Sequence, residues 1–337
     1  MKKIFLFLFL VLLMSGCKKS NDENLVKFIN NQISSKKSYQ ITATLEIYRN
    51  EEKFTYDVIS SYKKGDYFKV DLINQENNHQ QLILKDKESV YVLTPSLNKS
   101  FKFQSEWPYN NSQIYLLQPV LSDIEKDENK KFEESKNGYI ITSKVNYSTE
   151  KDFKKQKVYF DLDKKITKIE IIDDNNTVKM CLNIINIEYG KTFDKDYFNI
   201  NKYQKQELEE EKTDEKIQNQ TDTQSSIIEE VLYPMYVPVD TYLTGQDIIS
   251  TENGERIILT FSGESNFIFV QENLSDLESI NYVYGDPYLI LDSVGAVTDY
   301  SVSWIRDGVE YSVMSDTMSV DELLVVAQSV SVETVGK

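Results

Sequence analysis

The chain has 337 residues, with 38 basic side chains against 54 acidic ones and a net charge of −16. A surface of this sign repels nucleic acid and anionic lipid headgroups, so charge excludes nucleic acid as a partner and gives no help in binding a membrane. The length is sufficient for two domains, and 22 Tyr with 16 Phe favour well-packed β-sheets.

The N-terminus has the pattern of a secretory signal. Two lysines at residues 2–3 precede an unbroken apolar run at residues 4–14, which is shorter than the roughly 20 residues needed to span a bilayer. The tetrapeptide MSGC at residues 14–17 then resembles the lipobox of bacterial lipoproteins, with Met in place of the more usual Leu.

The lipobox resemblance implies a membrane anchor on Cys17. Residues 1–16 would be removed as a signal peptide, the Cys17 thiol would carry a diacylglycerol, and residues 17–26 would form a lipidated tether at the extracytoplasmic face of the cell membrane. Because one acyl chain gives only reversible attachment, stable anchoring needs two or more. The alternative is an ordinary cleaved signal followed by a chance cysteine.

Cys181 is the second of only two cysteines, so it has no disulfide partner once Cys17 is lipidated. An extracytoplasmic protein without a disulfide is typical of Gram-positive bacteria. The surrounding sequence, VKMCLNII, has the pattern of an apolar strand. We therefore expect a small buried side chain here and no nucleophile.

Residues 27–203 have the periodicity of one β-rich domain. A short helix is expected at residues 24–33, and alternating runs separated by turn signals then predict an antiparallel meander over residues 39–93. A second helix is expected at Ser112–Ile124, kinked by Pro119, followed by a charged surface loop at residues 126–137. Further strands are expected at residues 139–145, 157–161, 166–172 and 178–189. Nine to eleven strands with one or two helices predict a mainly β fold, a curved antiparallel half-barrel.

Residues 204–226 form a charged segment with no aromatic residue, Gly or Pro, which predicts a flexible linker. Residues 227–337 are poor in lysine and contain short strand patterns, a hairpin turn at residues 306–308, and a final helix. Ser319 and Glu322 have the spacing of a capping box at the start of this helix. The sequence thus predicts a small α+β C-terminal domain that moves semi-independently of the first.

Motifs for catalysis and metal binding are absent from the sequence. The single histidine, His79, lies in a turn pattern, and neither a Gly-x-Ser-x-Gly elbow nor His/Cys spacing for zinc is present. Asp-rich segments at residues 161–163 and 173–174 lack the glycine and closing glutamate of a calcium loop, and read as hairpin turns. The sequence therefore predicts a non-enzymatic protein without a cofactor or metal.

A curved sheet has a concave face that a helix can cover. Ile114, Leu117 and Leu121 lie on the apolar face of the expected helix, and we take them as candidate lining of a hydrophobic cavity for a lipid ligand. The alternative is that they only pack this helix on the sheet.

Three segments of the N-terminal half resemble the LolA-like lipoprotein-carrier family. They are the first strand (residues 41–48), KKGDYFKVD at residues 63–71 and LKDKESVYVLTP at residues 84–95. The family usually has kkPdkyRve and dGkkvwvYnP at the last two, so Gly65 replaces a proline and Leu-Thr-Pro replaces Tyr-Asn-Pro. The likeness covers residues 39–203, about half of the chain.

The resemblance implies a half-barrel capped by helices, with a cavity for acyl chains. It is strongest to the GerS-type sporulation and germination lipoproteins of Gram-positive spore formers, which implies a cell-wall amidase as protein partner. Residues 227–337 are similar to a small domain of unresolved function that follows LolA-like domains in Gram-positive lipoproteins. Three interpretations stay open: a lipid-anchored scaffold that binds a cell-wall hydrolase, a carrier of lipid or lipoprotein acyl chains, and an envelope-stress sensor.

Overall fold

The computed structural model describes residues 21–49, 52–94, 99–147, 152–203, 228, 230–274, 280–290 and 293–331. The expected signal peptide, Cys17 and the linker at residues 204–226 lie outside the described residues.

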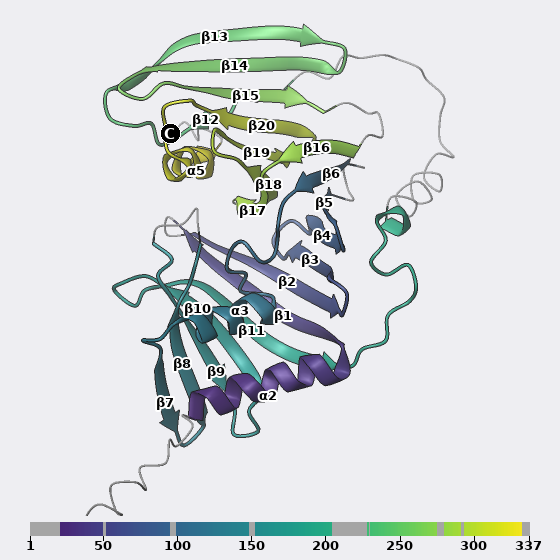
Figure 1. Cartoon of the computed structure of the whole chain (residues 1–337). Helices are drawn as coiled ribbons and strands as arrows, with labels where there is room; N and C mark the ends of the chain where they lie inside the picture. The colour runs from purple at the N-terminus through teal and green to yellow at the C-terminus, as the bar shows by residue number, and fades with distance from the viewer. Residues whose placement is uncertain are drawn as a thin grey trace, which may run out of the picture.

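One curved antiparallel sheet forms the N-terminal part of the molecule (Figure 1). Its central strand, β1, has β2 to β6 on one side and β11 to β7 on the other. The strands are β1 (Ser38–Arg49), β2 (Glu52–Lys63), β3 (Tyr67–Asn74), β4 (Gln80–Asp86), β5 (Ser89–Thr94), β6 (Lys99–Gln104), β7 (Lys131–Ser135), β8 (Gly138–Lys144), β9 (Lys155–Phe160), β10 (Ile166–Ile172) and β11 (Val178–Tyr189). The expected mainly β, curved antiparallel architecture is confirmed.

Helices α2 (Asn21–Lys36) and α3 (Leu117–Lys126) lie on the same face of this sheet (Figure 1). Asn30 on α2 donates a 2.7 Å hydrogen bond to Glu125 on α3. Alternate residues of β1, among them Ile41 and Leu45, are buried beneath the two helices because side chains of a strand point to opposite faces in turn. In the part of the chain that the structure describes, no helix is both long enough and apolar enough to cross a bilayer.

Helix α3 begins later than the sequence predicted, and the expected kink at Pro119 is wrong. The helix starts at Leu117, so Pro119 lies in its first turn. The N–H groups of a first turn have no partner inside the helix, and the missing N–H of proline therefore costs nothing there.

Residues 190–203 pass over the outer face of β3 to β5. Lys69, on that face, forms a buried ion pair with Asp71, 2.5 Å away, and its ammonium group lies 4.9 Å from the ring centroids of both Tyr197 and Tyr203. Ile200 joins a small apolar cluster with side chains of β4 and β5. The chain is thereby held against the sheet up to the last described residue before the linker.

The C-terminal part contains a second sheet, with strand order β13-β14-β15-β20-β19-β18-β17, and helix α5 (Val320–Gln328). The strands of this part are β12 (Tyr233–Pro234), β13 (Thr241–Thr251), β14 (Gly254–Gly263), β15 (Phe267–Asn273), β16 (Ile280–Tyr284), β17 (Asp286–Ile290), β18 (Ser293–Val297), β19 (Ser301–Arg306), β20 (Val309–Met314) and β21 (Val330–Ser331). The capping box of Ser319 and Glu322 is confirmed, and so is the hairpin turn between β19 and β20. The buried apolar residues of α5 belong to one core cluster with side chains of this sheet.

Several strands were not expected from the sequence. Strand β7 lies within the segment predicted to be a charged loop, and β13, β16 and β18 had not been predicted. The turns at Asp161 and Asp173 are hairpin turns as expected: the Asp173 carboxylate accepts backbone hydrogen bonds from Asn175 and Thr177, which lower its pKa.

Strand β16 joins the two parts of the molecule. It pairs in parallel with β6 and so becomes the last strand of the N-terminal sheet, although it belongs to the C-terminal part of the sequence. Gln81, which is 2% exposed, adds hydrogen bonds to Ser293 and to both backbone groups of Val294. The expectation of two semi-independent parts did not include this contact.

Candidate ligand pocket at the junction of the two parts

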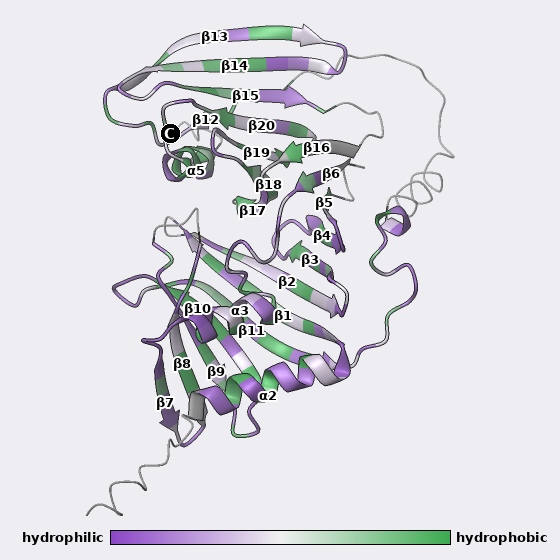
Figure 2. Ribbon diagram, in the orientation of Figure 1, coloured by the Kyte–Doolittle hydropathy of each residue, from purple (hydrophilic) through white to green (hydrophobic). Residues whose placement is uncertain are grey.

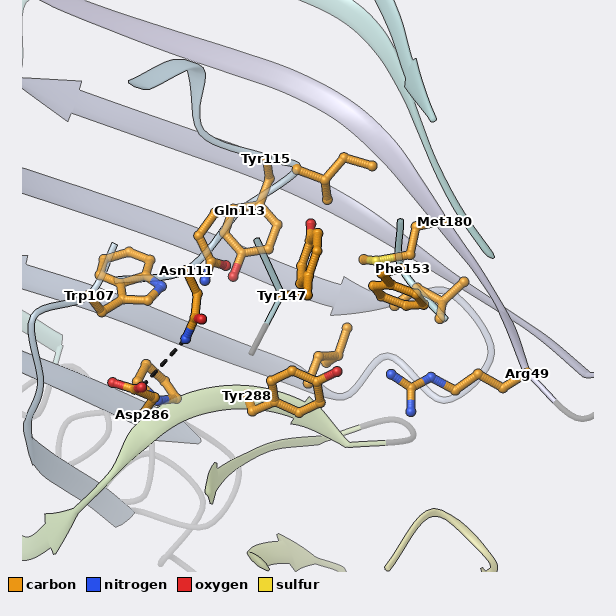
Figure 3. A pocket seen from close by; sticks show the side chains of 14 residues that line it. Arg49, Trp107, Asn111, Gln113, Tyr115, Tyr147, Phe153, Met180, Asp286 and Tyr288 are labelled. Carbon is orange, nitrogen blue, oxygen red and sulfur yellow. Dashed lines mark hydrogen bonds between the residues drawn. The ribbon is translucent and has the colours of Figure 1, made fainter. Parts of the chain in front are cut away.

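A pocket lies where the C-terminal part meets the open end of the curved sheet (Figure 3). About 590 Å³ of space lies between its residues when open solvent is included, and the enclosed part has room for only a few water molecules. The residues around it come from β1, the loop between β6 and α3, the β8–β9 connection, β11 and β17. They are Ile47, Arg49, Trp107, Asn111, Gln113, Ile114, Tyr115, Tyr147, Phe153, Met180, Asp286, Pro287, Tyr288 and Leu289.

The wall formed by the N-terminal part is apolar and largely buried. Trp107 and Ile114 are 1% and 2% exposed, and Trp107 packs edge-on against Phe68 with ring centroids 6.0 Å apart. Tyr147 and Phe153 form a second edge-on pair at 5.1 Å. Aromatic pairs of this geometry stabilise the packing of each ring, so this wall is preformed.

Two buried polar contacts hold the loop between β6 and α3. Lys85 is 5% exposed and donates a 2.8 Å hydrogen bond to the Trp107 carbonyl oxygen. The Ser112 hydroxyl donates to Asp123 on α3 at 2.6 Å and accepts from the Asn146 backbone N–H at 2.7 Å. The loop is therefore attached both to the sheet and to the helix, which fixes Ile114 and Tyr115 at the pocket.

Asp286, at the start of β17, is one of two charged residues that line the pocket, and the other is Arg49 at the end of β1. One carboxylate oxygen accepts a hydrogen bond from the Ser105 hydroxyl, and the other accepts from the side-chain amides of Asn110 at 2.7 Å and Asn111 at 3.5 Å. Figure 3 shows the contact between Asn111 and Asp286 at the rim. Asp286 thus holds the loop of the N-terminal part against the C-terminal part, and its carboxylate already accepts three hydrogen bonds from that loop.

The two tyrosine hydroxyls in the wall stay protonated. Burial raises the pKa of Tyr115 and of Tyr147 well above the usual range for a phenol. A neutral phenol donates one hydrogen bond and accepts others. The pocket therefore offers a mostly apolar surface with neutral polar groups, one hydrogen-bonded carboxylate and the guanidinium of Arg49.

The reactive residue types found in the sequence lie away from this pocket. Cys181 is 7% exposed, as expected, and burial raises the pKa of its thiol, so the reactive thiolate is disfavoured. His79 lies in the β3–β4 turn, where its backbone N–H donates to Asn77. Among the described residues, no three His, Cys, Asp or Glu side chains gather as a metal site would require.

Of the residues proposed from the sequence, Ile114 lines the pocket. Leu117 and Leu121 are 1% and 2% exposed and lie in the core between α3 and the sheet, outside the pocket lining. Cys17 lies outside the described residues. The sequence reasoning missed Asp286 and Tyr288, because no local pattern indicates that β17 packs against a loop about 175 residues earlier in the chain.

Comparison with known proteins places the chain in a family. It is 31% identical over 322 residues to sporulation protein YdcC of Bacillus subtilis (strain 168), an alignment that covers 95% of this chain and 93% of that protein. The chain belongs to the family of sporulation protein YdcC. The YdcC relationship extends across both sheets and the linker between them. No family model matches the chain.

Solved structures resemble this chain only loosely. The complex of MucA and MucB from Pseudomonas aeruginosa aligns with 92% of this chain at 11% identity and a TM-score of 0.33, covering 99% of the matched chain. The complex of the CwlD amidase of Clostridioides difficile with the GerS lipoprotein aligns with 52% of this chain at 20% identity and a TM-score of 0.32, covering 99% of the matched chain. A LolA superfamily protein from Nitrosomonas europaea aligns with 53% of this chain at 10% identity and a TM-score of 0.32, covering 98% of the matched chain. TM-scores below 0.5 assign no function.

Proposed function

We propose that this member of the YdcC family is a lipid-anchored, non-enzymatic binding protein that acts in sporulation at the extracytoplasmic face of the membrane. The observation that carries the proposal is the 31% identity to a sporulation protein along 95% of the chain. The N-terminal lipobox pattern supports the anchor on Cys17, and the engaged carboxylate and buried thiol support a binding role in preference to catalysis.

The anchor is tested by labelling growing cells with a palmitate analogue. The wild-type chain is expected to incorporate label and to fractionate with membranes, whereas Cys17→Ala loses both properties. Cys181→Ala is the matched control, because it removes the other cysteine and leaves the lipobox intact. Equal labelling of wild type and Cys17→Ala would contradict the anchor.

A cell-wall amidase is the protein partner that we propose, on the basis of the resemblance to GerS-type lipoproteins. The test is the equilibrium binding of the purified full chain to the purified sporulation amidase of the same organism, measured by interferometry. A saturable signal is expected, and a lysozyme-type hydrolase serves as an unrelated control. No signal at micromolar concentrations would remove the amidase from the proposal and leave the anchor and the sporulation role standing.

We propose the binding of an acyl chain as a second candidate function, because the resemblance to LolA-like carriers implies it and the junction pocket has a mostly apolar wall. The pocket has room for only a few water molecules, so it would have to widen to admit the chain. Native mass spectrometry of the full chain mixed with palmitate is expected to show one bound molecule. Ile114→Arg places a cation in the apolar wall and is expected to abolish the adduct. Ile185→Arg is the control, since Ile185 is 70% exposed on β11 and lies outside the pocket lining.

A further inference from the structure

Strand β13 leaves an open edge on the C-terminal sheet. Among the described residues β14 is its only partner strand, so the other side of β13 presents backbone N–H and C=O groups over a strand of 11 residues. Figure 1 shows β13 as the outermost strand of this sheet. An edge of this length can accept a further strand from another chain.

The open edge carries large exposed apolar side chains. In β13 these are Tyr242 (65% exposed), Leu243 (44%), Ile248 (59%) and Ile249 (44%), and Figure 2 shows a hydrophobic band within this strand. The preceding segment adds Met235, Tyr236 and Val239. Strand β7, the free edge of the other sheet, has the sequence KFEES instead, and such charges are what protects an edge from pairing.

The pairing register shows that the apolar face of the core continues onto β13. Leu243 lies opposite Phe261 and Ile248 opposite Ile257, and residues opposite each other in an antiparallel pair share a face. Phe261 and Ile257 are 4% and 1% exposed. The core face is thus covered at β14 and uncovered at β13, one strand further out.

The negative charge of the C-terminal part favours a basic partner at the free edge of β13. Residues 227–337 hold 19 of the 54 acidic residues and three of the 38 basic ones, so their net charge of −16 equals that of the whole chain. Asp240, Asp247 and Glu252 are exposed on or beside β13, while Arg256 on the neighbouring strand is paired with Glu272 at 2.7 Å. A second copy or an anionic membrane is repelled, and a basic segment is attracted.

We propose that the free edge of β13 docks an extended segment of a partner protein in which apolar residues alternate with Lys or Arg. Its backbone would pair with β13, its apolar side chains would cover Leu243 and Ile248, and its basic side chains would face Asp247 and the neighbouring carboxylates. This proposal goes beyond the sporulation role and stands without it.

The test uses the purified full chain and a synthetic peptide of eleven residues that alternates Val and Lys. The peptide is expected to bind saturably by fluorescence anisotropy and to slow hydrogen exchange of the β13 amides that do not pair with β14, which should exchange rapidly in the free protein. A Val/Glu peptide of the same length and a Val/Lys peptide methylated on alternate amide nitrogens are expected not to bind, because the first has the wrong charge and the second cannot form the ladder.

Ile248→Lys is the decisive variant, with Ile185→Lys as its matched control. Both place a lysine at an exposed isoleucine, 59% and 70% exposed, and only the first lies on the proposed edge. Ile248→Lys is expected to weaken binding of the Val/Lys peptide about tenfold or more, and Ile185→Lys to leave it unchanged. The proposal would be overturned by equal effects of the two variants or by peptide-induced protection outside β13. It would also be overturned if the β13 amides that do not pair with β14 were already protected in the free chain, or if a concentration-dependent dimer formed through β13.

Discussion

Asp123 on α3 is the carboxyl group for which the structure gives the clearest pH dependence. Burial raises its pKa from 3.8 to about 6, although the hydrogen bond from Ser112 and the charge of Lys126 act in the opposite direction. The native state therefore binds more protons than the unfolded chain between these two values. The free energy of unfolding that Asp123 contributes accordingly falls as the pH rises through this window.

Asp123→Asn is expected to remove this loss, because an amide oxygen can still accept from Ser112 and carries no charge. At pH 7 the variant should be more stable than the wild type by about 2 kcal/mol, and at pH 4 the two should be nearly equal. Urea unfolding of both proteins at both pH values measures the difference in their free energies of unfolding. The other carboxyl groups are the same in both proteins, so their contributions cancel in this difference. A wild type that is as stable as the variant at pH 7 would contradict the assignment.

Tyr39 connects β1 to the start of α3. Its hydroxyl donates to Gln118 at 2.6 Å and accepts from the Leu117 backbone N–H at 3.1 Å, and the residue is fully buried. Tyr39→Phe leaves both partners unsatisfied and is expected to lower the free energy of unfolding by about 1–3 kcal/mol. Tyr48→Phe, at a hydroxyl exposed to solvent beside Glu46, should change it by less than about 0.5 kcal/mol. Similar losses in the two variants, measured by urea unfolding, would refute this role.

Among the elements, α5 has the best-defined start. The Ser319 side chain accepts from the Glu322 backbone N–H, and the Glu322 carboxylate accepts from the Ser319 backbone N–H at 2.9 Å. Ser319→Ala is expected to cost about 1 kcal/mol, while Ser319→Asp keeps an acceptor at the cap and should cost a few tenths of that. Thermal unfolding of both variants checks the order, and a Ser319→Ala protein as stable as the wild type would contradict it.

Elements with a strong local signal could be predicted from the sequence, and those without one could not. The capping box and the alternation of β1 follow from local chemistry. Strand β13 was missed because its apolar residues occur in adjacent pairs, Tyr242-Leu243 and Ile248-Ile249, which is the pattern of a strand exposed on both faces. Strand β18, SVGAV, is recognisable only from its buried position between β17 and β19. Ile114 could be proposed for the pocket because the apolar face of a helix pattern indicates it, whereas no local pattern indicates Asp286.

At the scale of the whole molecule, the two parts are coupled through a few buried polar side chains, one parallel strand pair, and Val294 and Ala296 of β18, which join the core of the N-terminal part. Gln81 donates to Thr94, Ser293 and the Val294 carbonyl oxygen, and accepts from the Val294 N–H. Gln81→Leu is expected to leave these partners unsatisfied and to loosen the contact between the sheets.

Hydrogen exchange measures this loosening. In Gln81→Leu the amides of β16 to β18 should exchange at least about tenfold faster, and those of β1 and β2 should change much less, because β16 is separated from them in the sheet by β6, β5, β4 and β3. Uniform acceleration in all strands would show that Gln81 supports global stability and not the junction.

The central claim is that a chain anchored through Cys17 acts in sporulation at the membrane surface. It is tested most directly by counting heat-resistant spores in a strain that lacks the gene, complemented with the wild-type chain, Cys17→Ala or Cys181→Ala. We expect that deletion lowers the count, that the wild type and Cys181→Ala restore it, and that Cys17→Ala does not. A deletion strain that forms as many heat-resistant spores as its parent would contradict the sporulation role, and full restoration by Cys17→Ala would contradict the anchor.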